Sequence, residues 1–333
     1  MNIIKPVIHL ISKVRFKLYD WGVLKSYSFG VPVISIGNIS MGGTGKTPMV
    51  GWVVNQILLH NKKPCVITRG YNRKSNKMII INNNENNKYT LDQLGDEPFS
   101  LLKEYPNITM VIGDNKVAAI NVAINELDID VVVLDDGFQS LYIKRDLDVV
   151  MINAGDKSLV TRESLSSVSR SDVIIFKPFE GCSFKNYRKI LNKIRGEKIL
   201  KIRAQALFSI EGANNISGIK KTEPMIAVCG IGDSVSFKKS LINNNIIIKE
   251  LLTYGDHYNY TAEDMRFIYN KMTINDCQTI ITTTKDYYKL NVLNKSNKKI
   301  IMLKIKFDFL ETAESGCANK GELINLLKGA IAR

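Results

Sequence analysis

A short apolar segment followed by a glycine-rich loop limits what this 333-residue chain can fold into. Residues 31–36 are mostly apolar and β-branched, and residues 37–48 read Gly-Asn-Ile-Ser-Met-Gly-Gly-Thr-Gly-Lys-Thr-Pro. Residues 47–60 then have the pattern of a helix. A strand, a glycine-rich loop, Lys-Thr and a helix in this order allow backbone N–H groups and a helix N-terminus to hold polyphosphate. The segment therefore predicts a nucleotide-binding α/β fold.

The loop residues have expected roles in binding ATP and Mg²⁺. Lys46 would reach the β- and γ-phosphates, and the Thr47 hydroxyl would bind Mg²⁺. Ser40 stands where the usual motif has its first glycine, which leaves a chance glycine-rich turn as the alternative, but the flanking elements disfavour it. The predicted nucleotide-binding residues are Gly42, Gly43, Thr44, Gly45, Lys46 and Thr47.

Two adjacent carboxylates form a second part of the predicted site. Residues 131–134 are apolar and run into Asp135 and Asp136. In nucleotide-binding α/β folds, an Asp at the carboxyl end of a strand can hold the Mg²⁺ that bridges the phosphates. An Asp in this place is by itself usually a turn residue or a helix cap. Together with the phosphate loop, Asp135 and Asp136 are predicted metal ligands.

The distribution of apolar segments predicts two α/β lobes. Strands at 64–68, 108–112, 147–152 and 172–176 alternate with helices or loops, which indicates a mostly parallel sheet flanked by helices, like that of P-loop NTPases. Residues 77–87 look like a surface hairpin. The expected divisions are an N-terminal helix at 1–28, a nucleotide-binding lobe at 29–205 that residues 307–333 could complete, a linker at 206–218 and a smaller α/β lobe at 219–306.

Residues 3–21 predict an amphipathic N-terminal helix. Apolar side chains recur at spacings of three and four and form one stripe, made of Ile4, Val7, Ile11, Val14, Leu18 and Trp21. Such a stripe most often packs on the chain's own core. However, Trp21 at the end of the stripe and the basic flanking residues favour an anionic membrane surface.

The charge and cysteine content narrow the class of partner. A net charge of +14 suggests a polyanionic partner, such as nucleic acid, an anionic membrane or a phosphorylated substrate. Because no nucleic-acid-binding motif accompanies this charge, nucleic acid is not predicted as a partner.

The five cysteines are scattered without a C-x-x-C pair, so they indicate neither a disulfide framework nor a zinc site. No apolar run approaches the ~20 residues needed to cross a bilayer, and no secretion signal is predicted.

Several separate motifs follow one another along nearly the whole chain. They are the variant phosphate loop at 37–48, Thr68-Arg69-Gly70-Tyr71, Gly95-Asp96-Glu97-Pro98, Asp135-Asp136-Gly137-Phe138-Gln139, Arg162-Glu163, Asp256-His257-Tyr258 and Thr284-Lys285-Asp286. In this set and order the chain resembles the tetraacyldisaccharide 4′-kinases, which phosphorylate the lipid A precursor on the cytoplasmic face of the inner membrane in Gram-negative bacteria. The chain departs from that family at Ser140 and Ser164, where the family usually has His and Pro.

The resemblance implies roles for single residues. Asp96 would be the base for the acceptor hydroxyl, and His257 would be its partner, contributed by the second lobe. From the sequence alone, Asp96 could equally start a helix as a cap, and a loop histidine is more often a surface residue. The remaining implied roles are catalysis by Lys46, substrate binding by Arg69, Tyr71 and Arg162, with surface ion pairs as the alternative for the arginines, and metal binding by Glu163 beside Asp135 and Asp136.

The implied activity is ATP- and Mg²⁺-dependent transfer of the γ-phosphoryl group to the 4′-hydroxyl of a tetraacyldisaccharide 1-phosphate. The implied partners are this lipid substrate and the anionic inner-membrane surface, where the protein would be peripheral, with no nucleic acid and no obligate protein partner. The rival hypothesis is a membrane-associated P-loop switch ATPase. Met41 counts against the rival, because it stands where such proteins carry a lysine.

Overall fold

The structure is a computed structural model. It describes residues 4–39, 45–71, 73–82, 88–153, 162–177, 199–209, 223–309 and 319–332.

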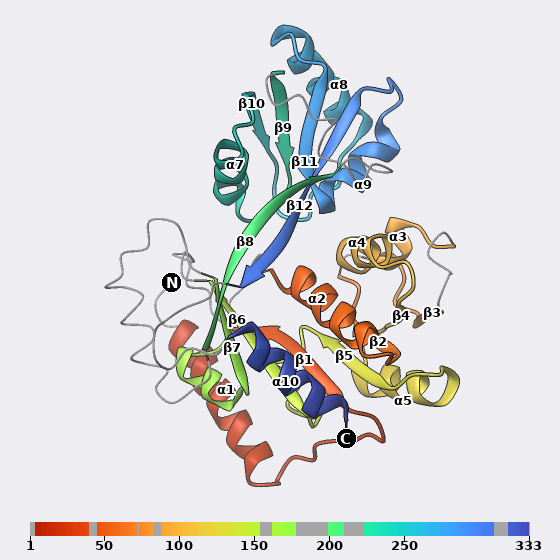
Figure 1. The fold of residues 1–333 in the computed structure, drawn as a ribbon, viewed down its shortest axis with the longest axis vertical. Helices are drawn as coiled ribbons and strands as arrows, with labels where there is room; N and C mark the ends of the chain where they lie inside the picture. The colour runs from red at the N-terminus through yellow and green to blue at the C-terminus, as the bar shows by residue number, and fades with distance from the viewer. Residues whose placement is uncertain are drawn as a thin grey trace.

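A single sheet of twelve strands runs through both lobes, in the order β10-β9-β11-β12-β8-β7-β6-β1-β5-β2-β4-β3 (Figure 1). Neighbouring strands are parallel except in the β3–β4 and β8–β12 pairs. The first lobe contains β1 (Val33–Asn38), β2 (Pro64–Thr68), β3 (Ile79–Ile81), β4 (Thr109–Ile112), β5 (Val131–Asp135), β6 (Leu147–Asn153) and β7 (Val173–Lys177). The second lobe contains β9 (Met225–Cys229), β10 (Ile248–Thr253) and β11 (Thr279–Thr283). The prediction of an α/β fold with a mostly parallel sheet is confirmed.

Helices cover both faces of the sheet in the first lobe. Ile34 and Ile36 of β1 face a core formed with α2 (Lys46–Leu59), α4 (Asp96–Glu104) and α10 (Lys320–Ile331). Val33 points to the opposite face, where α5 (Lys116–Glu126) packs. Because side chains alternate between the faces of a strand, strands covered on both faces must be apolar throughout. This explains the nearly continuous apolar runs of β1, β2 and β5.

The second lobe repeats this arrangement on a smaller scale. Its helices α8 (Ala262–Ile274) and α9 (Thr284–Leu293) share one core with β9 and β11. On the other face, α7 (Ser234–Asn243) packs through Phe237 and Leu241. Helix α8 begins with a capping box, in which Thr261 and Asp264 each accept a hydrogen bond from the other's backbone.

Two long antiparallel strands connect the lobes. They are β8 (Ile199–Ser209) and β12 (Lys299–Phe309), which pair along their length while the start of β8 pairs with β7. Figure 1 shows both strands crossing from one lobe to the other. Residues 206–209, which we expected to begin a polar linker, are therefore strand; the rest of that expected linker lies outside the described residues. Tyr288 of α9 packs against the cores of both lobes.

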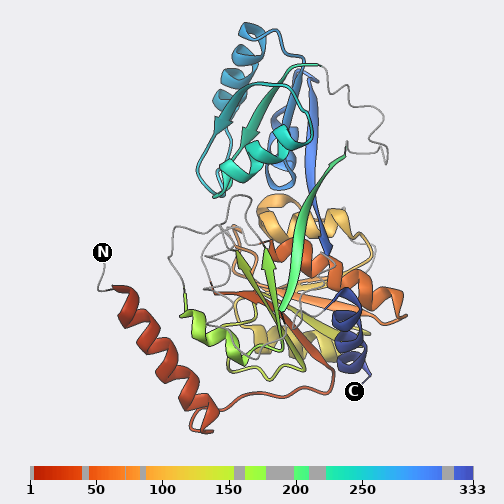
Figure 2. The ribbon, with the colours of Figure 1, turned by 60° about the vertical axis from the view of Figure 1, so that its left-hand side comes forward.

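Two further segments lie at the periphery of the first lobe, namely β3 and the N-terminal helix. The expected surface hairpin near residue 80 is wrong, because β3 forms the edge of the main sheet and pairs with β4. Helix α1 (Ile4–Asp20) projects from the first lobe (Figure 2) and contacts it where the Arg170 guanidinium lies 5.5 Å from the centre of the Phe16 ring. Its apolar side chains are largely exposed, including Val7, Leu10, Ile11 and Val14. Among the described residues, no helix is both long and apolar enough to cross a membrane.

Candidate active site

The end of β1 and the start of α2 lie at the carboxyl edge of the sheet. Gly45 has a φ of 88° and immediately precedes α2, whose first residues are Lys46 and Thr47. Glycine adopts this left-handed conformation without the steric cost that other residues have. Lys46 Nζ lies 3.5 Å from Asp136 Oδ1. The predicted Gly42, Gly43 and Thr44 lie outside the described residues.

Two glycines allow the ends of β1 and β5 to come together. A Cβ on Gly37 would lie 2.4 Å from Cβ of Phe138, and a Cβ on Gly137 would lie 2.4 Å from Oγ of Ser35. Both distances are far below van der Waals contact, so neither position can carry a side chain without movement of the backbone. This close approach sets the Asp135-Asp136 pair beside the start of α2.

Asp135 is fully enclosed at the end of β5. Its Oδ2 accepts a hydrogen bond from Thr68 Oγ1 at 2.9 Å, and its Oδ1 is buried without a hydrogen-bond partner. Burial, with a smaller effect from the Glu97 charge, raises the pKa of Asp135 to about 6. An orphaned carboxylate oxygen beside a phosphate loop is suited to a hard cation such as Mg²⁺.

Asp136 adopts a left-handed backbone conformation, with a φ of 51°. Its Oδ2 accepts a hydrogen bond from Arg162 at 2.7 Å. Burial opposes ionisation of this carboxyl, but Lys46 and Arg162 together hold its pKa below the usual range. Arg162, predicted to bind substrate, is therefore brought to the Asp135-Asp136 end of the sheet.

Asp96 is buried at the first turn of α4, directly after Gly95. The N-cap residue of this helix is Gly95, so Asp96 is not the capping residue. Instead, Oδ2 lies 3.0 Å from Nδ1 of His257 and 2.6 Å from Nζ of Lys289. Burial alone would raise the pKa of Asp96, but the hydrogen bonds from these two residues outweigh it and lower the pKa. The structure thus joins Asp96 to His257 across the two lobes and keeps the carboxylate ionised.

The Arg-Gly-Tyr and Gly-Asp-Glu-Pro motifs contact each other through their glycines. Gly70 and Gly95 both have positive φ, 69° and 88°. A Cβ on Gly95 would lie 2.5 Å from the carbonyl oxygen of Tyr71. As a result, the Tyr71 ring meets His257 edge to face, with centroids 5.0 Å apart. Arg69 is exposed at the same turn.

Three lysines surround these carboxylates. From the sequence, Lys285 was named only within the Thr284-Lys285-Asp286 motif, without a role of its own, and Lys116 and Lys289 were missed. Lys285 Nζ lies 2.5 Å from Oε1 of Glu97, and Lys289 follows one helical turn later on α9. Lys116 is buried and donates to the carbonyl oxygens of both Asp135 and Asp136, each at 2.7 Å. Their signal in the sequence is weak, because lysines on amphipathic helices usually face water. The Thr284-Lys285-Asp286 motif was the one clue to this part of the site.

Glu97 electrostatically links the Asp96 region with the region of Lys46 and Asp135. Burial would raise the pKa of Glu97, but Lys285 and, to a lesser extent, Lys46 lower it. The Glu97 charge in turn raises the pKa of Asp135. The Asp96-Glu97 pair therefore shares one electrostatic environment with Lys46 and the predicted metal carboxylate.

Glu163, a predicted metal ligand, forms an ion pair with the Arg170 side chain. Both of its carboxylate oxygens accept hydrogen bonds from Arg170, at 2.5 and 2.7 Å. Arg170 also stacks on Phe138, with its guanidinium 3.8 Å from the ring centroid, and ends the 3₁₀ helix η1 (Leu165–Arg170). Glu163 is thus tied to the loop that follows Asp135-Asp136, and metal binding by its carboxylate stays a prediction.

No cluster of three or more His, Cys, Asp or Glu side chains that could hold a metal occurs in the described ranges. This is compatible with Mg²⁺, which in nucleotide sites usually takes one or two carboxylates and completes its shell with phosphates and water. The orphaned oxygen of Asp135 fits such a site.

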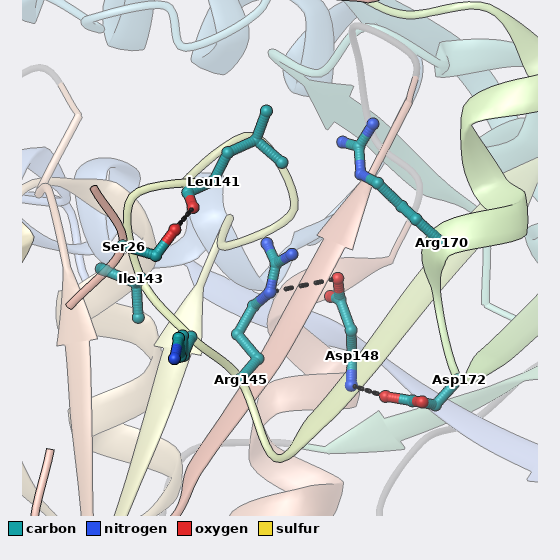
Figure 3. Close-up of a pocket in the computed structure, with 8 residues that line it drawn as sticks. Ser26, Leu141, Ile143, Arg145, Asp148, Arg170 and Asp172 are labelled. Atoms are coloured by element: carbon teal, nitrogen blue, oxygen red, sulfur yellow. Dashed lines mark hydrogen bonds and ion pairs between the residues drawn. The ribbon is translucent and has the colours of Figure 1, made fainter. Parts of the chain in front are cut away.

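A polar cavity of about 330 Å³ lies at the opposite edge of the sheet, where β6 and β7 begin. Figure 3 shows Arg145 and Asp148 pointing toward each other in this cavity, with Arg170 nearby. Asp148 is buried, and burial raises its pKa to about 6 although Arg145 opposes the shift. Because the cavity lies at the amino ends of the strands, it is separate from the phosphate loop.

A parallel α/β sheet with a Gly-Lys-Thr helix start, an orphaned carboxylate beside it and an ionised, enclosed Asp defines a nucleotide-dependent phosphotransferase. The family model of the tetraacyldisaccharide-1-P 4′-kinases matches residues 2–319. The chain belongs to this family, and it is a kinase of lipid A biosynthesis. Family membership favours this function over the switch-ATPase hypothesis.

Individual relatives agree with this family. A tetraacyldisaccharide 4′-kinase of Aquifex aeolicus is 31% identical over 299 residues, which cover 86% of this chain and 88% of the relative. One of Flavobacterium johnsoniae is 31% identical over 337 residues, covering 93% and 94% of the two chains. A crystal structure of the "apo" form of LpxK from Aquifex aeolicus in complex with ATP superposes with a TM-score of 0.75 at 27% identity, covering 98% of this chain and 96% of that one.

Proposed function

We propose that this kinase transfers the γ-phosphoryl group of ATP to the 4′-hydroxyl of a tetraacyldisaccharide 1-phosphate at the cytoplasmic face of the inner membrane. The observation that carries the proposal is the enclosed Asp96 carboxylate, which His257 and Lys289 hold from the other lobe. A base for an acceptor hydroxyl must be ionised before the reaction, and these two donors favour the ionised form.

In the proposed mechanism, Asp96 accepts the proton of the acceptor hydroxyl. As that proton leaves, the hydroxyl oxygen bonds to the γ-phosphorus, and the bond from the γ-phosphorus to the β,γ-bridging oxygen breaks. Lys46 stabilises the charge that develops on the phosphates. His257 fixes the orientation of Asp96, and the Tyr71 ring packed on its edge limits the movement of the imidazole.

Asp135, Asp136 and Thr47 are the proposed holders of Mg²⁺. The supporting feature is the buried Oδ1 of Asp135, which has no hydrogen-bond partner in the chain. When bound there, the ion would supply positive charge that neutralises the charge of the phosphates. Thr68 and Lys116 would fix the carboxyl end of β5 through its side chain and backbone.

Arg69 and Arg162 are the proposed contacts for the substrate's 1-phosphate. A guanidinium can bind a phosphate through two parallel hydrogen bonds. Arg69 is exposed beside Tyr71. Arg162 pairs with Asp136, so a phosphate would compete with that carboxylate for the same guanidinium.

The proposed membrane attachment rests on α1. The apolar side chains of Val7, Leu10, Ile11 and Val14 are exposed in the described part of the chain, and basic residues flank them. A helix of this kind lies in an anionic lipid interface with its apolar side buried. The acyl chains of the substrate could then stay in the bilayer while its sugar reaches Asp96.

The test of the proposed function identifies the product. Purified full chain is incubated with labelled ATP, Mg²⁺ and detergent-dispersed tetraacyldisaccharide 1-phosphate, and mass spectrometry locates the new phosphate. We expect a bisphosphorylated product with phosphate at the 4′ position. The matched control is the same lipid with its 4′-hydroxyl methylated, which should stay unmodified. An active wild-type enzyme that phosphorylates the methylated lipid equally well would contradict the assignment of the acceptor.

A further inference from the structure

Lys285, in the first turn of α9, forms an ion pair across the two lobes. Its Nζ lies 2.5 Å from Oε1 of Glu97, the second residue of α4. Both side chains are 27% exposed, whereas that of Lys289, one turn later, is only 6% exposed. Burial would lower the pKa of Lys285, but its contact with Glu97 outweighs burial and raises the pKa. Lys285 therefore carries a positive charge that a ligand from solvent can reach.

The Glu97 carboxylate is acted on by lysines of both lobes. Burial would raise its pKa, but the charge of Lys285 and, more weakly, that of Lys46 lower it. Lys46 is also the residue proposed to contact the β- and γ-phosphates of ATP. Phosphate oxygens bound at Lys46 would thus be a second anionic group within electrostatic reach of Lys285.

The backbone that carries Lys285 is fixed, so only its side chain needs to move. The next residue, Asp286, is fully buried and accepts hydrogen bonds from the N–H of Gly230 at 2.8 Å and from the Thr283 hydroxyl at 2.7 Å. A lysine has a compact charge on a flexible four-carbon stem, which allows its ammonium to change partners without movement of the helix.

We infer that Lys285 is a phosphate-binding residue supplied by the second lobe: when ATP binds, its ammonium leaves Glu97 and donates a hydrogen bond to an oxygen of the terminal phosphate. In the nucleotide-free protein, Glu97 holds the ammonium within the site. This inference rests on the proposed function in taking ATP as the phosphoryl donor. A cation supplied by a second domain can stabilise the charge on a phosphoryl group during transfer.

The alternative is a permanent ion pair that only joins the lobes. In that case, removal of Lys285 and removal of the Glu97 charge would break the same contact, and both changes would shift nucleotide affinity in the same direction. An exchange of partners predicts opposite directions, because Glu97 competes with the phosphate for one ammonium.

The test measures the affinity of the full chain for ATP and for ADP, each with Mg²⁺, by isothermal titration calorimetry. Lys285→Met removes the charge and keeps the length of the side chain. We expect ATP affinity to fall about 10- to 100-fold, as for loss of a hydrogen bond to a charged group. ADP affinity should change much less, because ADP lacks the terminal phosphate. Glu97→Gln frees the ammonium and should tighten ATP binding.

Two further sets of variants separate the contact from general effects of charge and folding. Lys285→Arg keeps a cation with N–H donors and should retain the preference for ATP over ADP. Lys271→Met and Glu250→Gln break a matched ion pair of the second lobe, with an N–O distance of 2.8 Å and side chains 29% and 32% exposed. These two variants should bind both nucleotides as the wild type does. Because Glu97→Gln retains Lys285, it decides the matter even if Lys285→Met does not fold.

The outcomes are distinct. Equal losses of ATP and ADP affinity in Lys285→Met, or weaker ATP binding in Glu97→Gln, would overturn the inference and leave the proposed function standing. A wild type that makes no bisphosphorylated lipid, while Lys285→Met selectively loses ATP affinity, would contradict the proposed lipid substrate and support the role of the lysine. A wild type that binds neither nucleotide would contradict both.

Discussion

Burial acts on Asp96 and Asp135 alike, but the two carboxyls differ in what surrounds them. Asp96 receives two donors, one of them an ammonium, and its pKa falls. Asp135 receives a neutral hydroxyl and lies near the Glu97 charge, and its pKa rises to about 6. Environments that separate the pKa values of nearby carboxyls are typical of sites in which the groups have different roles. This separation supports Asp96 as base and Asp135 as metal ligand.

The proposed contact of Lys46 with the ATP phosphates can be tested by substitution. Lys46→Ala should weaken ATP binding about 10- to 100-fold, since a hydrogen bond to a charged group contributes about 1.5–3 kcal/mol. Isothermal titration calorimetry with ATP and Mg²⁺ measures the change. Lys62→Ala, at an exposed position after α2, is the matched control and should bind ATP as the wild type does. Equal affinity in both variants would remove Lys46 from the nucleotide site.

A substitution at Gly95 tests the close contact between the Gly-Asp-Glu-Pro segment and the Arg-Gly-Tyr turn. Gly95→Ala combines a positive φ with a Cβ 2.5 Å from the Tyr71 carbonyl oxygen. We expect it to lower the free energy of unfolding by about 1–3 kcal/mol and to reduce kcat. Gly329→Ala is the control, because a Cβ there meets nothing within 4 Å. It should be neutral or slightly stabilising, as expected for Gly→Ala within a helix. Chemical denaturation of both variants gives the comparison.

Site residues that belong to a short sequence motif could be predicted from the sequence, and site residues outside any motif could not. Asp96 and His257 were predicted from short motifs, and the structure brings them together although they are 161 residues apart in the chain. Lys289 and Lys116 belong to no motif of their own. Each becomes recognisable only when folding encloses it against a carboxylate or a strand end, and the linear pattern does not contain that enclosure.

Among the elements, strands enclosed on both faces were the easiest to predict. The strand at 64–68 has the predicted bounds, because a buried parallel strand is an unbroken apolar run. Strand β8 was harder, since its second half reads as a polar connector and is held in place by pairing with β12. Strand β3 was misread because hairpin and edge-strand patterns are the same over three residues.

Asp148, the second residue of β6, makes a pH-dependent prediction for stability. Its pKa is about 6 in the folded state, above the ordinary value of 3.8, so the ionised carboxylate destabilises the fold above pH 6. This penalty disappears as the pH falls toward 4. Asp148→Asn should therefore raise the free energy of unfolding by about 1–3 kcal/mol at pH 8 and have little effect near pH 4.

Thermal and denaturant unfolding at both pH values measure this effect. Asp128→Asn is the control, since Asp128 is exposed and its surface ion pair with Lys63 contributes about 0–1 kcal/mol. A loss of stability in Asp148→Asn at pH 8 would contradict the account, because it would mean that the Arg145 pair outweighs the burial of the charge.

For the whole molecule, the site depends on two lobes joined by β8 and β12. Asp96 and Glu97 come from the first lobe, and Lys285, Lys289 and His257 come from the second. The aromatic rings of Phe99 and Tyr288 meet edge to face beside these ion pairs, with centroids 5.3 Å apart. Under the proposed function, a base assembled from both lobes requires them to be in contact, and we expect this to limit reaction with water before the substrate is enclosed.

Helix α1 gives a prediction for the intact protein. A variant with Ser at Val7, Leu10, Ile11 and Val14 should bind vesicles containing phosphatidylglycerol at least ~100-fold more weakly, because each apolar side chain buried in lipid contributes about 1.5–3 kcal/mol when fully transferred. Sedimentation with liposomes measures the partition. The control has Ser at Ile274 and Val292, which are even more exposed and lie on the second lobe. Equal loss in both proteins would mean that α1 has no special role.

The central claim is that Asp96 accepts the proton during phosphoryl transfer. The most direct measurement is the single-turnover rate of Asp96→Asn with ATP bound, alongside its ATP affinity and the rate of Asp92→Asn, a control at an exposed carboxylate on the short helix α3 (Leu91–Leu94). The account predicts that Asp96→Asn binds ATP like the wild type and transfers phosphate about 10²- to 10⁴-fold more slowly. A wild-type transfer rate in Asp96→Asn would contradict it.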